Sequence, residues 1–480
     1  MPLTILSRSQ LRDVLHSLTR DEITELQRNL SEALREYSTG AQDKGCSATY
    51  QPQRTAITRQ NGCTTLFMPA STGQTIGIKM ISLQDGSAAG CAVERAALDI
   101  ADGDSTSSRS RTGSVRNSVA SLSSDLSDLS VDSSQEDSNS VSPTLTTTTS
   151  GSGGDSADSS TLLSGCVNQQ PVVDNNVSDT MGAWPGAGTR DTSPKGSLTL
   201  LDSESLPFAL INAHELTAFR TALASLMIFN RRKKVRTILV FGAGTQAYWH
   251  IRLALSLRGD EIRRVYIVNR SFERAANLLR DIYLPENTKW RGDTKFSAMS
   301  TDFGEYNRII KEHVRKADVI FCCTPSVEPL FPAEFLTSRE GRQKGRLISA
   351  VGSYKAHMAE VHPDILRDEV NVSPPHRHFH KHTRRSGVVV VDSLDAAIKE
   401  AGEIVQAGIK PKQMVELGEL LMVRHATQEA ADEQKSLREW VERGNVIYKS
   451  VGLGLMDLVT GGDLVRLARE RKLGTTVEDF

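Results

Sequence analysis

Residues 237–247 read TILVFGAGTQA, an apolar run that ends in a glycine-rich turn and continues into a helical pattern. The first five residues predict a buried strand of a parallel sheet, because both of its faces are apolar. The two glycines allow a tight turn and a close approach of a diphosphate, and the following helix offers free N–H groups to phosphate. We therefore predict a dinucleotide-binding turn, rather than a strand-to-helix junction without a ligand. Its residues are Gly242, Gly244, Thr245, Gln246 and Ala247.

Strands and helices alternate around this turn, in a segment that we assign to residues 231–387. Further strands are predicted at 264–268, 318–323 and 346–351, and helices at 248–257 and 271–283. Such alternation is typical of a doubly wound, Rossmann-type α/β sheet. Residues 388–480 are predicted to add one more strand and then helices as far as residue 471, which complete the domains.

Two further parts of the chain, residues 1–100 and 196–230, predict a smaller α+β domain. Residues 1–15 are charged and helix-like, and a capping-box pattern at Thr19 and Glu22 then predicts the start of a helix. Strand-like runs follow at 54–57, 65–68, 76–81, 197–201 and 208–211. A helix after the last of these runs completes the α+β pattern.

Residues 101–195 separate the two parts of this domain and are dominated by serine, threonine, aspartate and glycine. The segment has too few apolar side chains to offset the entropy of ordering it. We therefore predict a disordered insertion. Phosphorylation of its many serines is one regulatory use that the sequence leaves open.

The overall composition predicts a soluble, cytoplasmic protein. The chain has 480 residues and a formal net charge of -1, so its charge gives no reason to expect nucleic acid or a membrane surface as a partner. No apolar run reaches the roughly 18 residues of a membrane span, and no secretory leader is expected at the N-terminus. The six cysteines show no CxxC spacing and are expected to be reduced.

A histidine-rich run at residues 376–382 is the pattern with most metal-binding potential. Neutral imidazoles bind zinc and related ions. Arg377 and Lys381 interrupt the run, however, and would repel a divalent cation. We favour an exposed basic loop and assign no metal site, with metal binding and a pH-dependent loop as the alternatives.

The residues at the end of the second predicted strand indicate whether NAD or NADP is preferred. A site that prefers NAD usually places an acidic residue there to accept hydrogen bonds from the ribose 2′-hydroxyl. This chain has Asn269, Arg270 and Ser271 instead. Arg270 can pair with a 2′-phosphate and Ser271 can hydrogen-bond it. We therefore predict NADP(H) in preference to NAD(H), with a solvated arginine at a helix start as the alternative.

Several dispersed motifs keep a fixed order along the chain. They are PQR at 52–54, MPA at 68–70, GIK at 77–79, TAFRTA at 217–222, the glycine turn, SAVGS at 349–353 and KSVG at 449–452. In order and approximate spacing they resemble the ornithine cyclodeaminase/mu-crystallin family. The resemblance implies a homodimer whose subunits join a Rossmann domain to an α+β domain for dimerisation and substrate binding. It also implies reduction of cyclic ketimines, interconversion of small amino acids, or conversion of ornithine to proline.

The resemblance further implies roles for single residues. Arg54 and Arg220 correspond to arginines that bind the substrate carboxylate, which a guanidinium fork suits. Lys79 corresponds to the active-site lysine, which can protonate an imine nitrogen. Because Lys79 interrupts the apolar run 76–81, an edge-strand gatekeeper is a competing explanation. The positions that correspond to the surroundings of the nicotinamide are Thr324, Val351, Gly352 and Ser450.

One position departs from the family pattern. Cyclodeaminases of this family carry an acid/base aspartate just after the AVG segment, where this chain has Tyr354. A phenol with an ordinary pKa of about 10 is a poor base at neutral pH, although Ser353 or Tyr354 can still donate a hydrogen bond to substrate. We therefore predict an enzyme that transfers hydride between NADP(H) and the imine or amine carbon of a small carboxylate-bearing substrate. The alternatives are an NAD-dependent ornithine cyclodeaminase and a non-catalytic, NADPH-bound ligand-binding or sensor protein.

Overall fold

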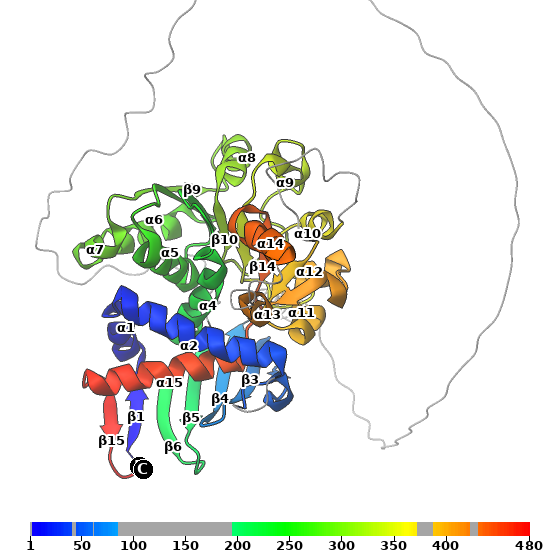
Figure 1. Cartoon of the computed structure of the whole chain (residues 1–480). Coiled ribbons are helices and arrows are strands. Elements are labelled where there is room, and N and C mark those ends of the chain that lie inside the picture. The colour runs from blue at the N-terminus through cyan, green and yellow to red at the C-terminus, as the bar shows by residue number, and fades with distance from the viewer. Residues whose placement is uncertain (1, 41–44, 61, 85–193, 372–386, 423–430) are drawn as a thin grey trace, which may run out of the picture. The chain divides into compact units, whose positions relative to one another are not determined.

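The computed structural model describes residues 2–40, 45–60, 62–84, 194–371, 387–422 and 431–480. These residues form two β-sheets, one of seven strands and one of eight (Figure 1). Nearly all of the predicted insertion lies outside the described residues, as does the histidine-rich run at 376–382.

The eight-stranded sheet is parallel in all of its described pairings, as a doubly wound fold requires. Its strands, in order across the sheet, are β13 (Met414–Glu416), β12 (Val389–Val391), β14 (Val446–Lys449), β11 (Leu347–Ala350), β10 (Val319–Cys322), β7 (Thr237–Phe241), β8 (Arg264–Asn269) and β9 (Lys295–Ser300). The chain order reverses at β7, which has β8 on one side and β10 on the other. Sheets of this kind bind ligands at such a switch point.

Helices flank this sheet, and two of them follow predicted strands directly. α5 (Thr245–Arg258) follows the glycine turn, and α6 (Phe272–Tyr283) follows β8. The other helices of this part are α7 (Thr288–Arg291), α8 (Tyr306–Lys316), α9 (Glu334–Thr337), α10 (Pro363–Val370), α11 (Leu394–Glu400), α12 (Gly402–Ala407), α13 (Leu417–Met422) and α14 (Ala431–Arg443).

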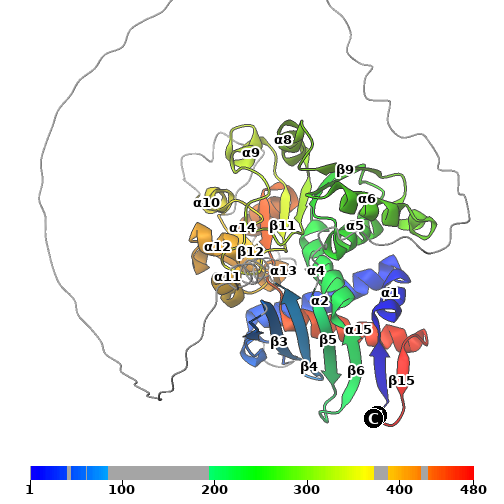
Figure 2. The same ribbon diagram turned by 180° about the vertical axis from the view of Figure 1, so that it is seen from behind.

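The seven-stranded sheet is assembled from both ends of the chain. Its strands, in order, are β15 (Thr475–Val477), β1 (Leu3–Leu6), β6 (Pro207–Asn212), β5 (Lys195–Leu201), β4 (Ile76–Gln84), β3 (Cys63–Ser71) and β2 (Thr55–Thr58). Its helices are α1 (Arg8–His16), α2 (Arg20–Thr39), α4 (Ala213–Phe229) and α15 (Gly454–Glu470). α2 and α15 lie side by side over one face of the sheet (Figure 1), and the reverse view shows the strands in front of them (Figure 2). The predicted fold class, a Rossmann-type sheet with an α+β part, is confirmed.

The first residues of the chain differ from the prediction of a helix. They form β1, which pairs in parallel with β6 and antiparallel with β15. The helix begins only at Arg8, because Ser7 and Gln10 form a capping box around its first turn. The second capping box, between Thr19 and Glu22, is present as predicted. Local sequence could not reveal β1, since its partners lie hundreds of residues away.

The C-terminal segment also contains more strands than the single one predicted. It contributes β12, β13 and β14 to the parallel sheet and β15 to the other sheet. These strands have three or four residues each, which is too short for a recognisable alternation of apolar and polar side chains. Their pairing partners, rather than their own patterns, define them as strands.

Lys79 lies in the interior of the seven-stranded sheet. Its strand, β4, pairs with β3 on one side and β5 on the other, so the explanation as an edge-strand gatekeeper is wrong. Gly77, Lys79 and Ile81 face the buried side, where α15 packs. Ile76 and Met80 lie on the opposite face, and their side chains are 47% and 37% exposed.

Candidate active site

The carboxyl ends of five adjacent parallel strands lie level at one edge of the eight-stranded sheet. The register aligns residues at or next to the ends of β14, β11, β10, β7 and β8. These strand ends and the loops after them carry most of the predicted cofactor residues, namely Gly242, Gly244, Asn269, Arg270, Ser271, Thr324, Val351, Gly352 and Ser450. The structure therefore places these residues along one edge of the sheet, on both sides of the switch point at β7.

The turn after β7 leaves room for a phosphate at the start of α5. Gly242 has a φ of +110°, and a Cβ there would lie 2.7 Å from the carbonyl oxygen of Cys323. Gly244 is the N-cap of α5, and no described atom lies within 4 Å of the place its Cβ would take. Ala247 is fully buried, as close packing of helix and strand requires. The first N–H groups of α5 are therefore placed to meet an anion.

The side chains of Thr245 and Gln246 turn toward α4. Thr245 Oγ1 lies 3.2 Å from Nε2 of His214, and Gln246 Nε2 donates to the carbonyl of Thr217 at 3.5 Å. For these two residues the backbone, rather than the side chain, is placed for a ligand of the turn.

The residues at the end of β8 form the start of α6. Asn269 Nδ2 donates to the carbonyl oxygen of Ser271 at 2.9 Å, and Ser271 Oγ caps α6 by accepting the N–H of Arg274 at 3.3 Å. The side chain of Arg270 is exposed between them. Arg270 is thus an exposed residue directly before the N-cap of α6.

Three charged side chains from distant segments meet in a buried group that we call the cationic cluster: Lys79 of β4, Arg220 of α4 and Asp457 of α15. Lys79 Nζ lies 2.8 Å, and Arg220 Nε 3.2 Å, from the same atom, Asp457 Oδ1. The side chains of Lys79 and Asp457 are fully buried, and that of Arg220 is 5% exposed. With two cations and one carboxylate, the cluster has one positive charge in excess.

Two properties of the cationic cluster suit acid–base chemistry. Oδ2 of Asp457 is buried and has no hydrogen-bond partner among the described residues. Burial lowers the pKa of Lys79 to about 8; the charge of Asp457 opposes this shift, and the charges of Arg220 and Arg54 add to it. Lys79 therefore titrates near neutral pH, where a lysine can both give and take a proton.

Arg54, just before β2, pairs with a carboxylate outside the cationic cluster. Its Nε donates to Oε1 of Glu400, at the end of α11, at 2.9 Å, and its Nη2 contacts the other oxygen. Burial lowers the pKa of Arg54; the charge of Asp392 opposes this shift and that of Arg220 adds to it. The structure thus places Arg54 within electrostatic reach of Arg220, while its described bonds go to Glu400.

Asp392, the residue after β12, fixes the loop that joins the sheet edge to the cationic cluster. Its carboxylate accepts the hydroxyl of Ser450 at 2.8 Å and the N–H groups of Val451 and Gly452 at 3.0 and 2.7 Å. Gly452 has a φ of +94°, and a Cβ there would lie 2.9 Å from Nη2 of Arg220. The hydroxyl of Ser450 is therefore bound to Asp392, and Gly452 lets Arg220 lie against the loop.

A second buried group, the acidic cluster, consists of Glu360, Glu403 and Lys449. Oε1 of Glu403 accepts the backbone N–H of Glu360 at 2.7 Å, and Lys449 Nζ lies 3.3 Å from Oε2 of Glu403. Ser353 is fully buried, and its hydroxyl donates to Oε1 of Glu403 at 2.6 Å. Its one hydroxyl proton is thus used inside the protein, so the structure does not support Ser353 as a donor to substrate.

A sequence profile matches residues 197–461, more than half of the chain, and it describes the ornithine cyclodeaminase/mu-crystallin family. The chain belongs to this family. It is 27% identical over 279 residues to a Delta(1)-pyrroline-2-carboxylate reductase of Bacillus cereus, which covers 57% of this chain and 70% of that relative. It is 24% identical over 276 residues to the ketimine reductase mu-crystallin of Mus musculus, covering 57% of this chain and 69% of the relative.

A solved structure of similar fold is that of the Delta(1)-pyrroline-2-carboxylate reductase of Thermococcus litoralis in complex with NADH and L-proline. The TM-score is 0.58 with 16% sequence identity, and the match covers 99% of this chain and 100% of that one. At this identity the likeness concerns the fold.

Three carboxylates in this family member are not foreseen from its sequence: Asp392, Glu360 and Asp457. Each directly adjoins apolar residues that are buried, and a buried charge requires a partner. This signal marks a buried charge, but it does not identify the partner. The partners can be identified only in the folded structure, where Asp457 contacts Lys79, which is 378 positions away in the sequence.

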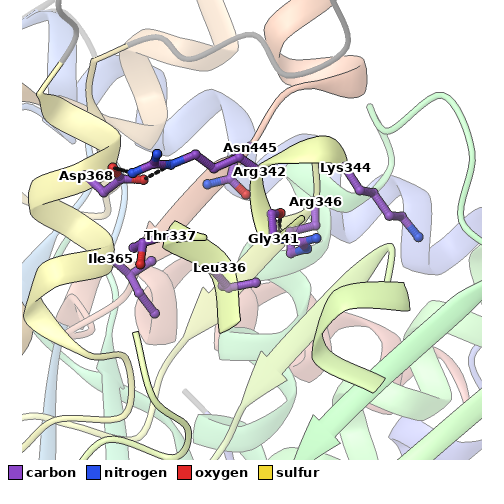
Figure 3. Close-up of a pocket in the computed structure, with 9 residues that line it drawn as sticks. All are labelled: Leu336, Thr337, Gly341, Arg342, Lys344, Arg346, Ile365, Asp368 and Asn445. Carbon is purple, nitrogen blue, oxygen red and sulfur yellow. Dashed lines mark hydrogen bonds and ion pairs between the residues drawn. The ribbon is translucent and has the colours of Figure 1, made fainter. Parts of the chain in front are cut away.

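The pocket drawn in Figure 3 lies away from the candidate site. Its lining includes Arg346, which directly precedes β11, and Asn445, which directly precedes β14 (Figure 3). These positions are at the amino ends of parallel strands, whereas the predicted cofactor residues follow the carboxyl ends. Arg342 and Asp368, both in its lining, form an ion pair (Figure 3).

Within the described ranges, no group of three or more histidine, cysteine, aspartate or glutamate side chains is arranged to hold a metal ion. Nor is any helix in those ranges both long enough and apolar enough to cross a membrane.

Proposed function

We propose that this family member is a nicotinamide-dependent oxidoreductase acting at the imine or amine carbon of a small carboxylate-bearing substrate. The observation that carries the proposal is the cationic cluster, in which two buried cations share one oxygen of Asp457 beside the loop after β14. An excess positive charge in a buried site favours an anion, and a guanidinium matches a carboxylate in shape. The relatives named as a pyrroline-carboxylate reductase and a ketimine reductase support the same chemistry.

The residues of the chain divide the work as follows. When bound, the nicotinamide supplies or accepts the hydride. Arg220 and Arg54 bind the substrate carboxylate. To do so, Arg54 breaks its ion pair with Glu400 and pairs with the substrate carboxylate instead. Lys79, as an ammonium, gives a proton to the imine nitrogen during reduction and takes one back during oxidation. Hydride addition to carbon and proton addition to nitrogen together convert C=N into CH–NH.

Asp457 has two tasks in this proposal. Its Oδ1 holds Lys79 and Arg220 in place. Its Oδ2 accepts the N–H that the substrate nitrogen carries in its protonated iminium and amine forms, because this oxygen is buried and has no hydrogen-bond partner in the described part of the chain. A bound substrate would then satisfy a buried acceptor that is otherwise unpaired.

The cofactor residues present in the chain fit a dinucleotide. Gly242, Gly244 and the N-terminus of α5 hold the diphosphate, since the turn offers free N–H groups and the space of a missing Cβ. Thr324, Val351 and Gly352 border the nicotinamide. We infer that NADP(H) is preferred over NAD(H), because Arg270 is exposed beside the start of α6 and no carboxylate occupies residues 269–271.

Imine reduction is favoured over cyclodeamination by Tyr354. This residue stands where cyclodeaminases carry an acid/base aspartate, and the ammonium of Lys355 lies 5.9 Å from the centre of its ring. A neighbouring positive charge does not turn a phenol into a carboxylate-like base at the substrate amine.

We also propose that the protein is a homodimer joined through the seven-stranded sheet. α15 and α4 pack against one face of this sheet. On the opposite face the apolar side chains of Ile57, Ile76 and Met80 are 54%, 47% and 37% exposed. An exposed apolar sheet face of this kind is suited to burial against the same face of a second copy.

The test is NADPH oxidation by the full-length protein with a panel of cyclic ketimines and of 2-oxo acids mixed with amines. We expect turnover of at least one cyclic ketimine, with a higher kcat/KM for NADPH than for NADH. Ammonia release from ornithine would instead support cyclodeamination, and tight NADPH binding without turnover would support a sensor. Either outcome overturns the proposal.

A further inference from the structure

One buried carboxylate joins the loops that follow β10 and β11. Oε1 of Glu360 accepts the backbone N–H of Thr324 at 2.7 Å and its hydroxyl at 3.2 Å. Oε2 of Glu360 accepts the N–H of Gly352 at 2.6 Å and that of Ser353 at 3.3 Å. Each oxygen accepts hydrogen bonds from one loop, so the width of the carboxylate sets the distance between the two loops.

The two loops are also in direct contact. A Cβ at Gly352 would overlap the carbonyl oxygen of Thr324, so no larger residue fits without a shift of the backbone. β10 and β11 are neighbours, with Cys322 opposite Ala350, so both loops begin at the same level of the sheet. Glu360 draws the loops together, and Gly352 permits the approach.

Glu360 is held in turn by the rest of the acidic cluster. Its own N–H donates to Oε1 of Glu403, and the same oxygen accepts the hydroxyl of Ser353. Lys449 contacts Oε2 of Glu403 at 3.3 Å and donates to the carbonyl of Ser353 at 2.7 Å. Glu403 lies in the first turn of α12 and Lys449 is the last residue of β14, so two further elements anchor the carboxylate.

Burial makes this carboxylate unfavourable in isolation, which argues against an incidental contact. Glu360 is fully buried, and burial raises its pKa to about 7 against the opposing charge of Lys449. Both of its oxygens are already bonded to the two loops. The group is therefore arranged to hold a geometry rather than to bind a ligand.

We propose that Glu360 is a positioning residue that sets the spacing of the Thr324 and Gly352 loops, and thereby the placement of the nicotinamide. The inference rests on the proposed function, in which these loops border the nicotinamide. Glu360 acts only through the backbone of the loops. Its loss should therefore slow hydride transfer more than it weakens substrate binding, since a misplacement of about 1 Å can cost about 100-fold in rate.

The variant Glu360→Gln tests the inference. It keeps the shape of the side chain but turns an NH2 group toward the donors of one loop. We expect kcat to fall about 10- to 100-fold while the substrate KM changes by less than about threefold. The primary isotope effect with NADPH deuterated at the transferred position should rise. Binding of NADPH should weaken, whereas binding of 2′,5′-ADP, which lacks the nicotinamide, should not.

Glu369→Gln is the matched control. Glu369 of α10 is 1% exposed, and its Oε2 accepts Nδ2 of Asn445 at 2.8 Å, on the amino-end side of β14. The control changes a buried carboxylate of the same kind far from both loops, so kcat and the isotope effect should be unchanged. If Glu360→Gln fails to fold, Gly352→Ala is the second variant. It separates the loops by a methyl group without changing charge, and it should give the same kinetic pattern.

Hydrogen exchange separates this inference from the proposed function, because it needs neither substrate nor cofactor. The amides of Thr324, Gly352 and Ser353 should exchange slowly in the wild-type protein, faster in Glu360→Gln and unchanged in Glu369→Gln. Unaltered exchange at these amides, or an equal loss of NADPH and 2′,5′-ADP binding, overturns the inference. If the wild-type protein binds neither NADPH nor NADH, the proposed function is overturned, and the exchange rates then still decide whether Glu360 holds the loops.

Discussion

The cationic cluster and the acidic cluster each bury three ionisable side chains. They carry opposite excess charge above about pH 7, where Glu360 is ionised. In the acidic cluster the excess charge is balanced inside the protein. Glu360 accepts hydrogen bonds from the backbone of two loops, and Oε2 of Glu403, which has no hydrogen bond among the described residues, lies 3.3 Å from the ammonium of Lys449. In the cationic cluster a single oxygen of Asp457 serves both cations, and its other oxygen has no hydrogen-bond partner among the described residues.

This difference separates a cluster that maintains structure from one that is prepared for a ligand. Buried charges are tolerated when they are paired or hydrogen-bonded. A cluster whose excess charge is satisfied by backbone N–H groups gains nothing from a further ion. A cluster with an excess cation and an unpaired acceptor gains from a substrate that carries both a carboxylate and an N–H group.

The largest expected effect comes from replacing the lysine of each cluster by methionine. Lys79→Met should lower kcat/KM about 1000-fold, because the proton donor is lost. Its stability should change little, since Arg220 still pairs with Asp457. Lys449→Met should instead lower the free energy of unfolding by about 3–5 kcal/mol, because two buried carboxylates lose their cation. Steady-state kinetics and denaturant unfolding of both variants check this prediction.

Similar behaviour of the two variants would contradict this functional difference between the two clusters. Equal loss of stability would mean that the cationic cluster is as structural as the acidic one. Activity above about a tenth of the wild-type value in Lys79→Met would remove Lys79 from the role of proton donor.

A smaller effect is expected in the pH dependence of imine reduction. Reduction needs the ammonium form of Lys79, whose pKa burial lowers to about 8. kcat/KM should therefore be level below about pH 8 and fall as pH rises above it. The charge of Asp457 raises the pKa of Lys79, so Asp457→Asn should move this fall to lower pH. A profile of kcat/KM against pH for both proteins measures the shift. If kcat/KM of Asp457→Asn falls over the same pH range as that of the wild-type protein, a group other than Lys79 titrates there.

The smallest effect is expected at Arg270, which lies outside both clusters. Arg270→Ala should lower the preference for NADPH over NADH about tenfold, the value of one charge-assisted hydrogen bond. The kcat at saturating cofactor and the stability should be unchanged. Arg280, exposed in the last turn of the same helix, is the matched control, and Arg280→Ala should leave the preference as it is. If the two variants give the same preference, Arg270 does not contact the 2′-phosphate.

Much of the fold was predictable because its central strands lie in buried, largely apolar runs. β7, β8, β10 and β11 all lie where the apolar pattern places them. β1, β13, β14 and β15 were missed. Length does not separate them from β10 and β11, which also have four residues each; the missed strands are defined by their pairing with strands elsewhere in the chain. The prediction of a single strand after residue 388 therefore underestimated the number of strands in the C-terminal segment, and the reason is physical. Hydrogen-bond partners far along the chain can make a strand out of residues with no strand pattern of their own.

By itself, the sequence determined the parallel sheet, the glycine turn at its switch point and the family, since these depend on local patterns and on the order of motifs. Only the tertiary structure decided which charges meet. Lys79 and Asp457 stand in unrelated apolar runs, and Glu360 follows the loops that it joins. Their bonds form because folding excludes water from those positions, and a charge without water must find its partner in space rather than along the chain.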